Sequence, residues 1–135
     1  RQLFASTMAQ QMEMPLEEIG EVSKRSKQPV AISSICAVLA ESEIINHVTQ
    51  GCAVEDIVMG AQLSIADRVI ALLRQVGIQG AVALTGAVSK NAGMVAALEQ
   101  RLGAPLLTSP DSEFAGALGA ALLAHKRLRK MESVR

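Results

Sequence analysis

The fold is decided by residues 84–91, which read Leu-Thr-Gly-Ala-Val-Ser-Lys-Asn. A short apolar run, residues 81–84, leads into this stretch, and a helical pattern over residues 92–102 follows it. A continuous apolar run of strand length fits a parallel strand buried on both faces better than a half-exposed one. The stretch therefore predicts a buried strand, a turn at Gly86 and a helix that ends at Gly103.

This turn is also the first candidate for a functional site. A helix that starts after a buried strand places backbone N–H groups at the carboxyl end of the strand, where α/β proteins bind phosphates and nucleotides. Gly86 allows a positive φ or the close approach of a ligand. Lys90 can supply a positive charge, and Asn91 can form a hydrogen bond or cap the helix. The alternative is that Gly86 only makes a tight turn, since one glycine is a weak signal and neither dinucleotide-binding nor Walker A motif is present.

The spacing of apolar residues in the rest of the chain is mostly helical. It predicts further helices at residues 2–13, just after Pro15, at 36–47, at 54–76 and at 113–130. The remaining segments are a polar linker at 23–28, a strand or extended segment at 30–35, and a second strand at 105–108. Two parallel strands do not make a stable sheet by themselves. We therefore expect upstream residues or a partner chain to flank them, and we expect the chain to be part of something larger.

Small residues form one face of the last predicted helix. Gly116, Gly119 and Ala120 follow the i, i+3, i+4 spacing of that face. This pattern predicts close packing of the helix on the sheet, and such packing also leaves room for an adenosine beside the glycine turn.

Composition narrows the class of protein. The chain has 135 residues, which suits one domain, and its 13 basic and 13 acidic residues give zero net charge. A neutral chain with 1% aromatic residues is not expected to bind nucleic acid, whereas it tolerates self-association. The sequence shows no signal peptide and no apolar run long enough to span a membrane. Its two cysteines are too few for a disulfide framework, so we expect a protein of the reducing cytoplasm.

The chain contains two cysteines. Cys36 lies at the predicted start of a helix, where the helix dipole favours the thiolate that ligates metals, although a single cysteine is more often a small buried apolar residue. Cys52 follows Gly51 in a turn, and the sequence assigns it no role. Glu43 and His47 are spaced i, i+4 and can pair on one helix face.

Taken together, several segments strongly resemble the activators of 2-hydroxyacyl-CoA dehydratases and benzoyl-CoA reductases. The resemblance rests on residues 32–43 (ISSICAVLAESE), 85–93 (TGAVSKNAG), 97–99 (ALE), 102–103 (LG) and 116–121 (GALGAA), which occur in the family's order. It extends from about Phe4 to Ala124.

The resemblance implies a fold and an activity. Members of the family have two lobes of the actin-like, ribonuclease-H-like (ASKHA) type, with ATP between them. They form homodimers that hold one 4Fe–4S cluster at the interface. ATP hydrolysis drives a low-potential electron onto the dehydratase or reductase component. The fold class expected here is thus α/β: the helix-rich C-terminal lobe of such an ATPase, with few parallel strands.

The resemblance also implies roles for particular residues. Cys36 matches a cysteine ligand of the cluster. Gly86, Ala87 and Lys90 match the adenosine-side motif of the C-terminal lobe, and Gln62 on the long helix is expected to face the adenine. Ala87 replaces the second glycine of the family's turn, so a positive φ there would cost on the order of 1 kcal/mol.

Other motifs of the family precede the position that matches Arg1. These are a Cys-x-x-Gly-Thr-Gly segment with the first cluster cysteine, and the acidic turns that bind phosphate and Mg²⁺. We therefore expect residues 1–135 to form a single truncated lobe that does not hydrolyse ATP alone, with cluster and dimerisation helices in residues 1–50 and the nucleotide-side α/β part in residues 51–135. We assign it no catalytic residue. The alternative is a degenerate stand-alone module that dimerises and binds without ATPase activity.

Overall fold

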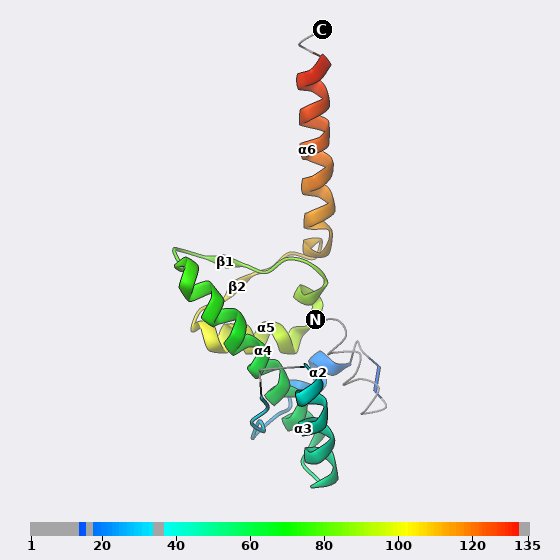
Figure 1. Cartoon of the computed structure of the whole chain (residues 1–135), viewed down its shortest axis with the longest axis vertical. Coiled ribbons are helices and arrows are strands. Elements are labelled where there is room, and N and C mark those ends of the chain that lie inside the picture. The colour runs from blue at the N-terminus through cyan, green and yellow to red at the C-terminus, as the bar shows by residue number, and fades with distance from the viewer. Residues whose placement is uncertain (1–13, 16–17, 34–36, 133–135) are drawn as a thin grey trace.

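The computed structural model describes residues 14–15, 18–33 and 37–132. In chain order the elements are α2 (Ile19–Ser23), α3 (Ala37–Thr49), α4 (Val54–Val76), β1 (Val82–Ala83), the 3₁₀ turn η1 (Ala87–Lys90), α5 (Ala92–Leu102), β2 (Leu106–Leu107), the 3₁₀ turn η2 (Ser112–Phe114) and α6 (Ala115–Glu132). Figure 1 shows α2, α3, α5 and the two strands gathered around α4, with α6 projecting away from them.

Helix α4 is the central element, and its bounds agree with the sequence prediction. Glu55 and Asp56 lie in its first turn, where carboxylates face the positive end of the helix dipole. At the other end Gly77 adopts a φ of 90°, and its amide donates to the carbonyl oxygen of Leu73 at 3.0 Å. A glycine at this position ends the helix because side chains disfavour positive φ.

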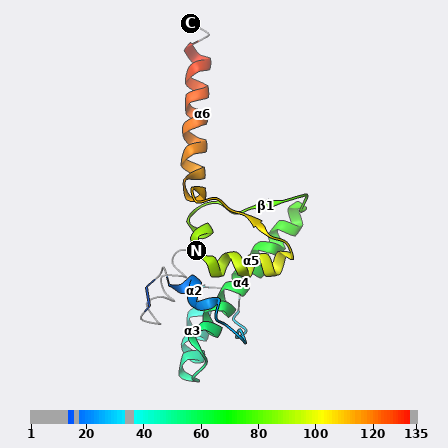
Figure 2. The ribbon, with the colours of Figure 1, turned by 180° about the vertical axis from the view of Figure 1, so that it is seen from behind.

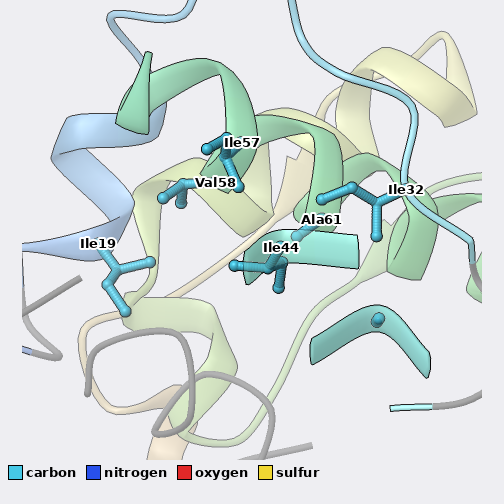
Figure 3. Packing of buried hydrophobic residues seen from close by; sticks show 7 residues of the cluster. Ile19, Ile32, Ile44, Ile57, Val58 and Ala61 are labelled. Atoms are coloured by element: carbon cyan, nitrogen blue, oxygen red, sulfur yellow. The ribbon is translucent and has the colours of Figure 1, made fainter. Parts of the chain in front are cut away.

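The first hydrophobic cluster packs on the N-terminal half of α4. Its buried members are Ile19, Ile32, Ala40, Ile44, Ile57, Val58 and Ala61. Figure 3 shows side chains from α2, α3, α4 and the segment before α3 converging on one another. This cluster holds α2 and α3 against α4.

A second cluster packs on the C-terminal half of α4. Its buried members are Leu63, Ala66, Ile70, Met94, Ala97 and Leu98, which come from α4 and α5. Leu84 and Leu106, beside the two strands, are partly buried against it. The second cluster therefore fixes the strands and the turns that follow them.

The two strands are parallel, as predicted. Val82 pairs with Leu106 and Ala83 with Leu107, and the amide of Leu84 donates to the carbonyl oxygen of Leu107 at 2.9 Å. The prediction that the first strand is buried on both faces is wrong, because Ala83 and Leu107 are exposed while Val82 and Leu106 are partly buried. Within the described residues, Leu84 and Leu106 pack against the cluster formed by α4 and α5, whereas Ala83 and Leu107 point away from it and are exposed.

Helix α6 also differs from its prediction. It has the predicted position in the chain, but it contains no buried residue, and a Cβ atom added at Gly116 or Gly119 would meet nothing within 4 Å. Figures 1 and 2 show from opposite sides that α6 leaves the body directly after η2. The predicted close packing of its small face on the sheet is therefore wrong for the described part of the chain, where the two-residue strands offer it no surface.

The N-terminal predictions are only partly covered. A short helix follows Pro15, at Ile19–Ser23, and residues 30–33 are neither helix nor strand. The helix predicted at residues 2–13 lies outside the described residues, as does Cys36, with which the helix now seen as α3 was predicted to begin. Within the described ranges no helix is both long and apolar enough to cross a membrane.

Candidate nucleotide-binding turn

The predicted glycine turn follows β1 at the carboxyl ends of the two strands. Gly86 has φ 86° and ψ 175°, a backbone conformation that is essentially restricted to glycine. Its amide donates to the carbonyl oxygen of Ser112 at 2.8 Å. Its own carbonyl oxygen accepts hydrogen bonds from the amide of Ser89 at 3.0 Å and from Ser89 Oγ at 2.7 Å. Gly86 therefore turns the chain and joins η1 to η2.

Ala87 occupies this turn without backbone strain. It is the first residue of η1, and 3₁₀ geometry has a negative φ that alanine adopts readily. The cost expected for a positive φ at Ala87 does not arise. The side chain of Ala87 is exposed, and neither its amide nor that of Val88 has a recorded acceptor among the described residues.

Lys90 lies at the end of η1 and forms an ion pair with Glu113 of η2. The Lys90 side chain is 57% exposed, whereas the Glu113 side chain is 25% exposed. The positive charge predicted at this turn is therefore present, but a carboxylate already contacts it.

Asn91 caps the following helix, as the sequence suggested. Its Oδ1 atom accepts a hydrogen bond from the amide of Met94 at 3.0 Å. The same oxygen accepts from Gln62 Nε2 at 3.3 Å. Asn91 thereby links the start of α5 to the middle of α4.

Gln62 lies behind the turn and is only 4% exposed. Its Oε1 atom has no hydrogen-bond partner within the part of the chain that the structure describes. A Cβ atom at Gly93 would lie 2.5 Å from Oε1 and 1.9 Å from Ser23 Oγ, so a glycine is needed where α5 approaches α4 and α2. The predicted contact of Gln62 with adenine stays a prediction.

The structure thus brings the four predicted binding residues together in one region. Gly86, Ala87 and Lys90 share a single turn, and Gln62 reaches it through Asn91. Sequence reasoning missed Ser112 and Glu113. Their position after the second strand could have indicated them, because the carboxyl ends of neighbouring parallel strands lie at the same edge of a sheet.

The metal site predicted at Cys36 is not described, because that residue lies outside the described ranges. Within those ranges no group of three or more His, Cys, Asp or Glu side chains is arranged to hold a metal ion. The described residues alone therefore do not supply a ligand set for a 4Fe–4S cluster.

Cys52 and His47 lie together beside a separate cavity. Cys52 Sγ is 3.8 Å from His47 Nδ1, and the cavity of about 500 Å³ lies between residues 28–31 and 47–56. The predicted pairing of Glu43 with His47 is not observed, because Glu43 accepts a hydrogen bond from the amide of Ser33 instead.

Asp56 closes one side of this cavity and holds the preceding loop. Its Oδ1 atom accepts hydrogen bonds from Ser26 Oγ at 2.7 Å and from the amides of Gln28 at 2.9 Å and Lys27 at 3.0 Å. These donors, Ser26 first, lower the pKa of Asp56 below its ordinary value, since they stabilise the charged form. The arrangement is a structural clamp between α4 and the loop.

A glycine turn between β1 and the capped helix α5 is typical of α/β proteins, many of which bind phosphate-containing ligands at this edge of the sheet. Comparison with known proteins is more specific. Residues 3–124 match the BadF/BadG/BcrA/BcrD ATPase family, and the chain belongs to that family.

Characterised relatives agree with this assignment. The chain is 43% identical over 127 residues to the (R)-2-hydroxyglutaryl-CoA dehydratase activating ATPase of Acidaminococcus fermentans, covering 94% of this chain and 49% of the relative. It is 37% identical over 127 residues to the activator of lactoyl-CoA dehydratase of Anaerotignum propionicum, again covering 94% and 49%. The chain therefore spans about half the length of these relatives.

Solved structures give the same result. The activator of 2-hydroxyisocaproyl-CoA dehydratase from Clostridium difficile, with bound ADPNP, matches 98% of this chain and 49% of its own, with a TM-score of 0.88 and 36% identity. Component A of the Acidaminococcus fermentans dehydratase matches 92% and 48%, with a TM-score of 0.85 and 44% identity. The predicted fold class, a helix-rich lobe of an activator ATPase, is confirmed.

Proposed function

We propose that this chain is the nucleotide-binding C-terminal lobe of an ATP-dependent activator of a 2-hydroxyacyl-CoA dehydratase or benzoyl-CoA reductase. The observation that carries the proposal is the match over almost the whole chain to an activator that binds ADPNP. The glycine turn supports it, because in this chain the turn has the backbone geometry and the charge suited to a nucleotide.

Each part of the turn has a distinct task in this proposal. Gly86 keeps a bulky side chain away from the ligand, and the first amides of η1, which lack partners in the described chain, offer hydrogen bonds to it. Lys90 supplies a positive charge that attracts the anionic nucleotide to the turn. Gln62, held by Asn91, presents a buried amide from α4 to the adenine side.

The proposal extends to electron transfer and to partners. Cys36 would be one thiolate ligand of a 4Fe–4S cluster shared between two copies of the protein, and such clusters need four ligands. The cluster would supply a low-potential electron to the dehydratase or reductase component. Relatives named as activators of such enzymes support a partner of that kind.

Direct binding tests the proposal. Isothermal titration of the 135-residue chain with ADP and with ATP is expected to show one site per chain, and Lys90→Met is expected to weaken binding. Thr49→Ala, on the distant end of α3, serves as the matched control and should bind as the wild type does. Absence of binding at millimolar nucleotide would overturn the proposal.

A second candidate function is a stand-alone binding module without ATPase activity. It is favoured by the large apolar side chains exposed on α3 and α6, among them Leu39, Ile45, Leu118, Leu122 and Leu123. This alternative predicts a stable dimer by analytical ultracentrifugation and no nucleotide binding. A chain that is monomeric and binds ADP would exclude it.

A further inference from the structure

The two 3₁₀ turns after the strands are joined at two points. One is the backbone hydrogen bond from the Gly86 amide to the Ser112 carbonyl oxygen, at 2.8 Å. The other is the ion pair between Lys90 and Glu113, which lie 23 residues apart in sequence. Within the described residues, each of these two side chains forms an ion pair only with the other.

Several hydrogen bonds hold the backbone of η2, the turn that carries Glu113. Ser112, next to it, is buried, and its Oγ atom accepts a hydrogen bond from the Ser109 amide at 2.7 Å. The Ser112 amide donates to the Ser109 carbonyl oxygen at 3.0 Å, and the Phe114 amide donates to that of Asp111 at the same distance. The backbone that carries Glu113 is therefore held in place, and the Glu113 side chain is the less exposed member of the ion pair.

Lys90 is the adjustable partner of the pair. Its backbone is fixed between Ser89, which is bonded to Gly86, and Asn91, whose amide donates to the Val88 carbonyl oxygen at 3.0 Å. Its side chain is more than half exposed and has a flexible four-carbon stem. The ammonium group can therefore leave Glu113 for another anion nearby without any change in the turn.

We propose that Glu113 competes with an anionic nucleotide for the Lys90 ammonium group and thereby weakens nucleotide binding at this turn. This inference rests on the proposed function, since it concerns the same site. The carboxylate holds the lysine ammonium group away from the ligand and offsets the positive charge that would attract a nucleoside diphosphate.

The size of the effect follows from the exposure of the pair. Exposed ion pairs of this kind are weak, so releasing Lys90 is expected to strengthen ADP binding by about two- to fivefold. Screening by salt reduces interactions between exposed charges, so the difference should shrink as ionic strength rises.

The experiment is isothermal titration of ADP into the whole 135-residue chain and its variants. Glu113→Gln keeps the shape of the side chain and removes its charge, and ADP is expected to bind this variant about two- to fivefold more tightly than the wild type. Asp111→Asn is the matched control. It removes one negative charge from an exposed position beside η2 whose carboxylate has no ion-pair partner in the described structure. It should change affinity less than Glu113→Gln does.

A double-mutant cycle isolates the competition from general charge effects. In a Lys90→Met background, Glu113→Gln should lose most of its benefit. The inference is overturned if wild-type chain binds ADP and Glu113→Gln binds no more tightly than Asp111→Asn, or if the gain persists without Lys90. Failure of the wild-type chain to bind ADP at all would instead overturn the proposed function.

Discussion

At the scale of single residues, Gly86 carries the strictest backbone requirement of the turn. Its φ of 86° with ψ of 175° is a conformation in which other residues cost about 1–3 kcal/mol. A Cβ atom at this position would meet nothing within 4 Å, so the cost is one of backbone strain alone. Gly86→Ala is therefore expected to lower the free energy of unfolding by about 1–3 kcal/mol in urea denaturation.

The matched control is another glycine with equally open surroundings. Gly119 lies within α6, and a Cβ atom there also meets nothing within 4 Å. Because alanine is the better helix former, Gly119→Ala should leave stability unchanged or raise it by up to about 1 kcal/mol. Equal effects of the two substitutions would show that the Gly86 conformation is not required.

Asp56 gives a prediction about pH. Its folded pKa lies below the ordinary value of 3.8, and Ser26 is the largest cause. A carboxyl group with a lowered folded pKa stabilises the fold above its unfolded pKa, and this contribution is lost as pH falls through that value towards the folded pKa. Ser26→Ala should therefore move the Asp56 pKa upward and flatten the loss of stability below about pH 4.

The measurement is the Asp56 carboxyl resonance followed by NMR as a function of pH. Lys27→Met is the comparison, because the charge of Lys27 is the smallest of the causes that lower the pKa. It should raise the pKa less than Ser26→Ala does. A pKa that does not change in Ser26→Ala would contradict the clamp between α4 and the loop.

The sequence predicted the position of some residues at the turn and missed others. Gly86, Lys90 and Asn91 follow a strand directly, so local chain order indicates their roles. Glu113 lies 23 residues after Lys90, and the contact between them depends on the parallel pairing of two short strands. The sequence predicts two parallel strands, but the local pattern does not fix the register that brings Glu113 to Lys90.

At the scale of elements, helix ends were predictable because glycines define them. Gly77 and Gly103 both adopt positive φ and both donate to a carbonyl oxygen in the preceding turn. The packing of α6 was not predictable in the same way. Its small residues are compatible with close packing, but a pattern does not specify the surface that would be packed against.

The exposure of α6 leads to a prediction about hydrogen exchange. Helix α6 has no buried residue, whereas α4 contains nine. An isolated helix of this length is marginally stable in water, since packing supplies most helical stability. Amides of α6 should therefore exchange much faster than those at the centre of α4, as measured by mass spectrometry.

Protein concentration serves as the control for this measurement. Rapid exchange of α6 that does not change on dilution would agree with a helix that packs on nothing in the described chain. Protection of α6 equal to that of α4 would contradict the prediction. Protection that disappears on dilution would identify a second copy of the chain as the surface that covers it.

At the scale of the whole molecule, α4 connects two separate hydrophobic clusters. Ile57 and Val58 belong to the first cluster, and Ile70 belongs to the second. Between them lies the polar contact of Gln62 with Asn91. The two parts expected within the single lobe, residues 1–50 and 51–135, both contribute side chains to the first cluster.

Helix α4 contributes buried residues to both hydrophobic clusters. We therefore expect that unfolding one cluster disrupts the other, so that the described elements from α2 to β2 unfold in one cooperative transition. Ile57→Val and Ile70→Val should each cost about 0.5–1.5 kcal/mol, and each should lower protection in both clusters by the same amount. Native-state hydrogen exchange under increasing urea measures this directly. Ile78→Val, at an exposed position after α4, is the control and should have little effect. If Ile57→Val lowered protection in α3 but left the protection of α5 unchanged, the two clusters would be independent folding units, and α4 would unfold locally between them.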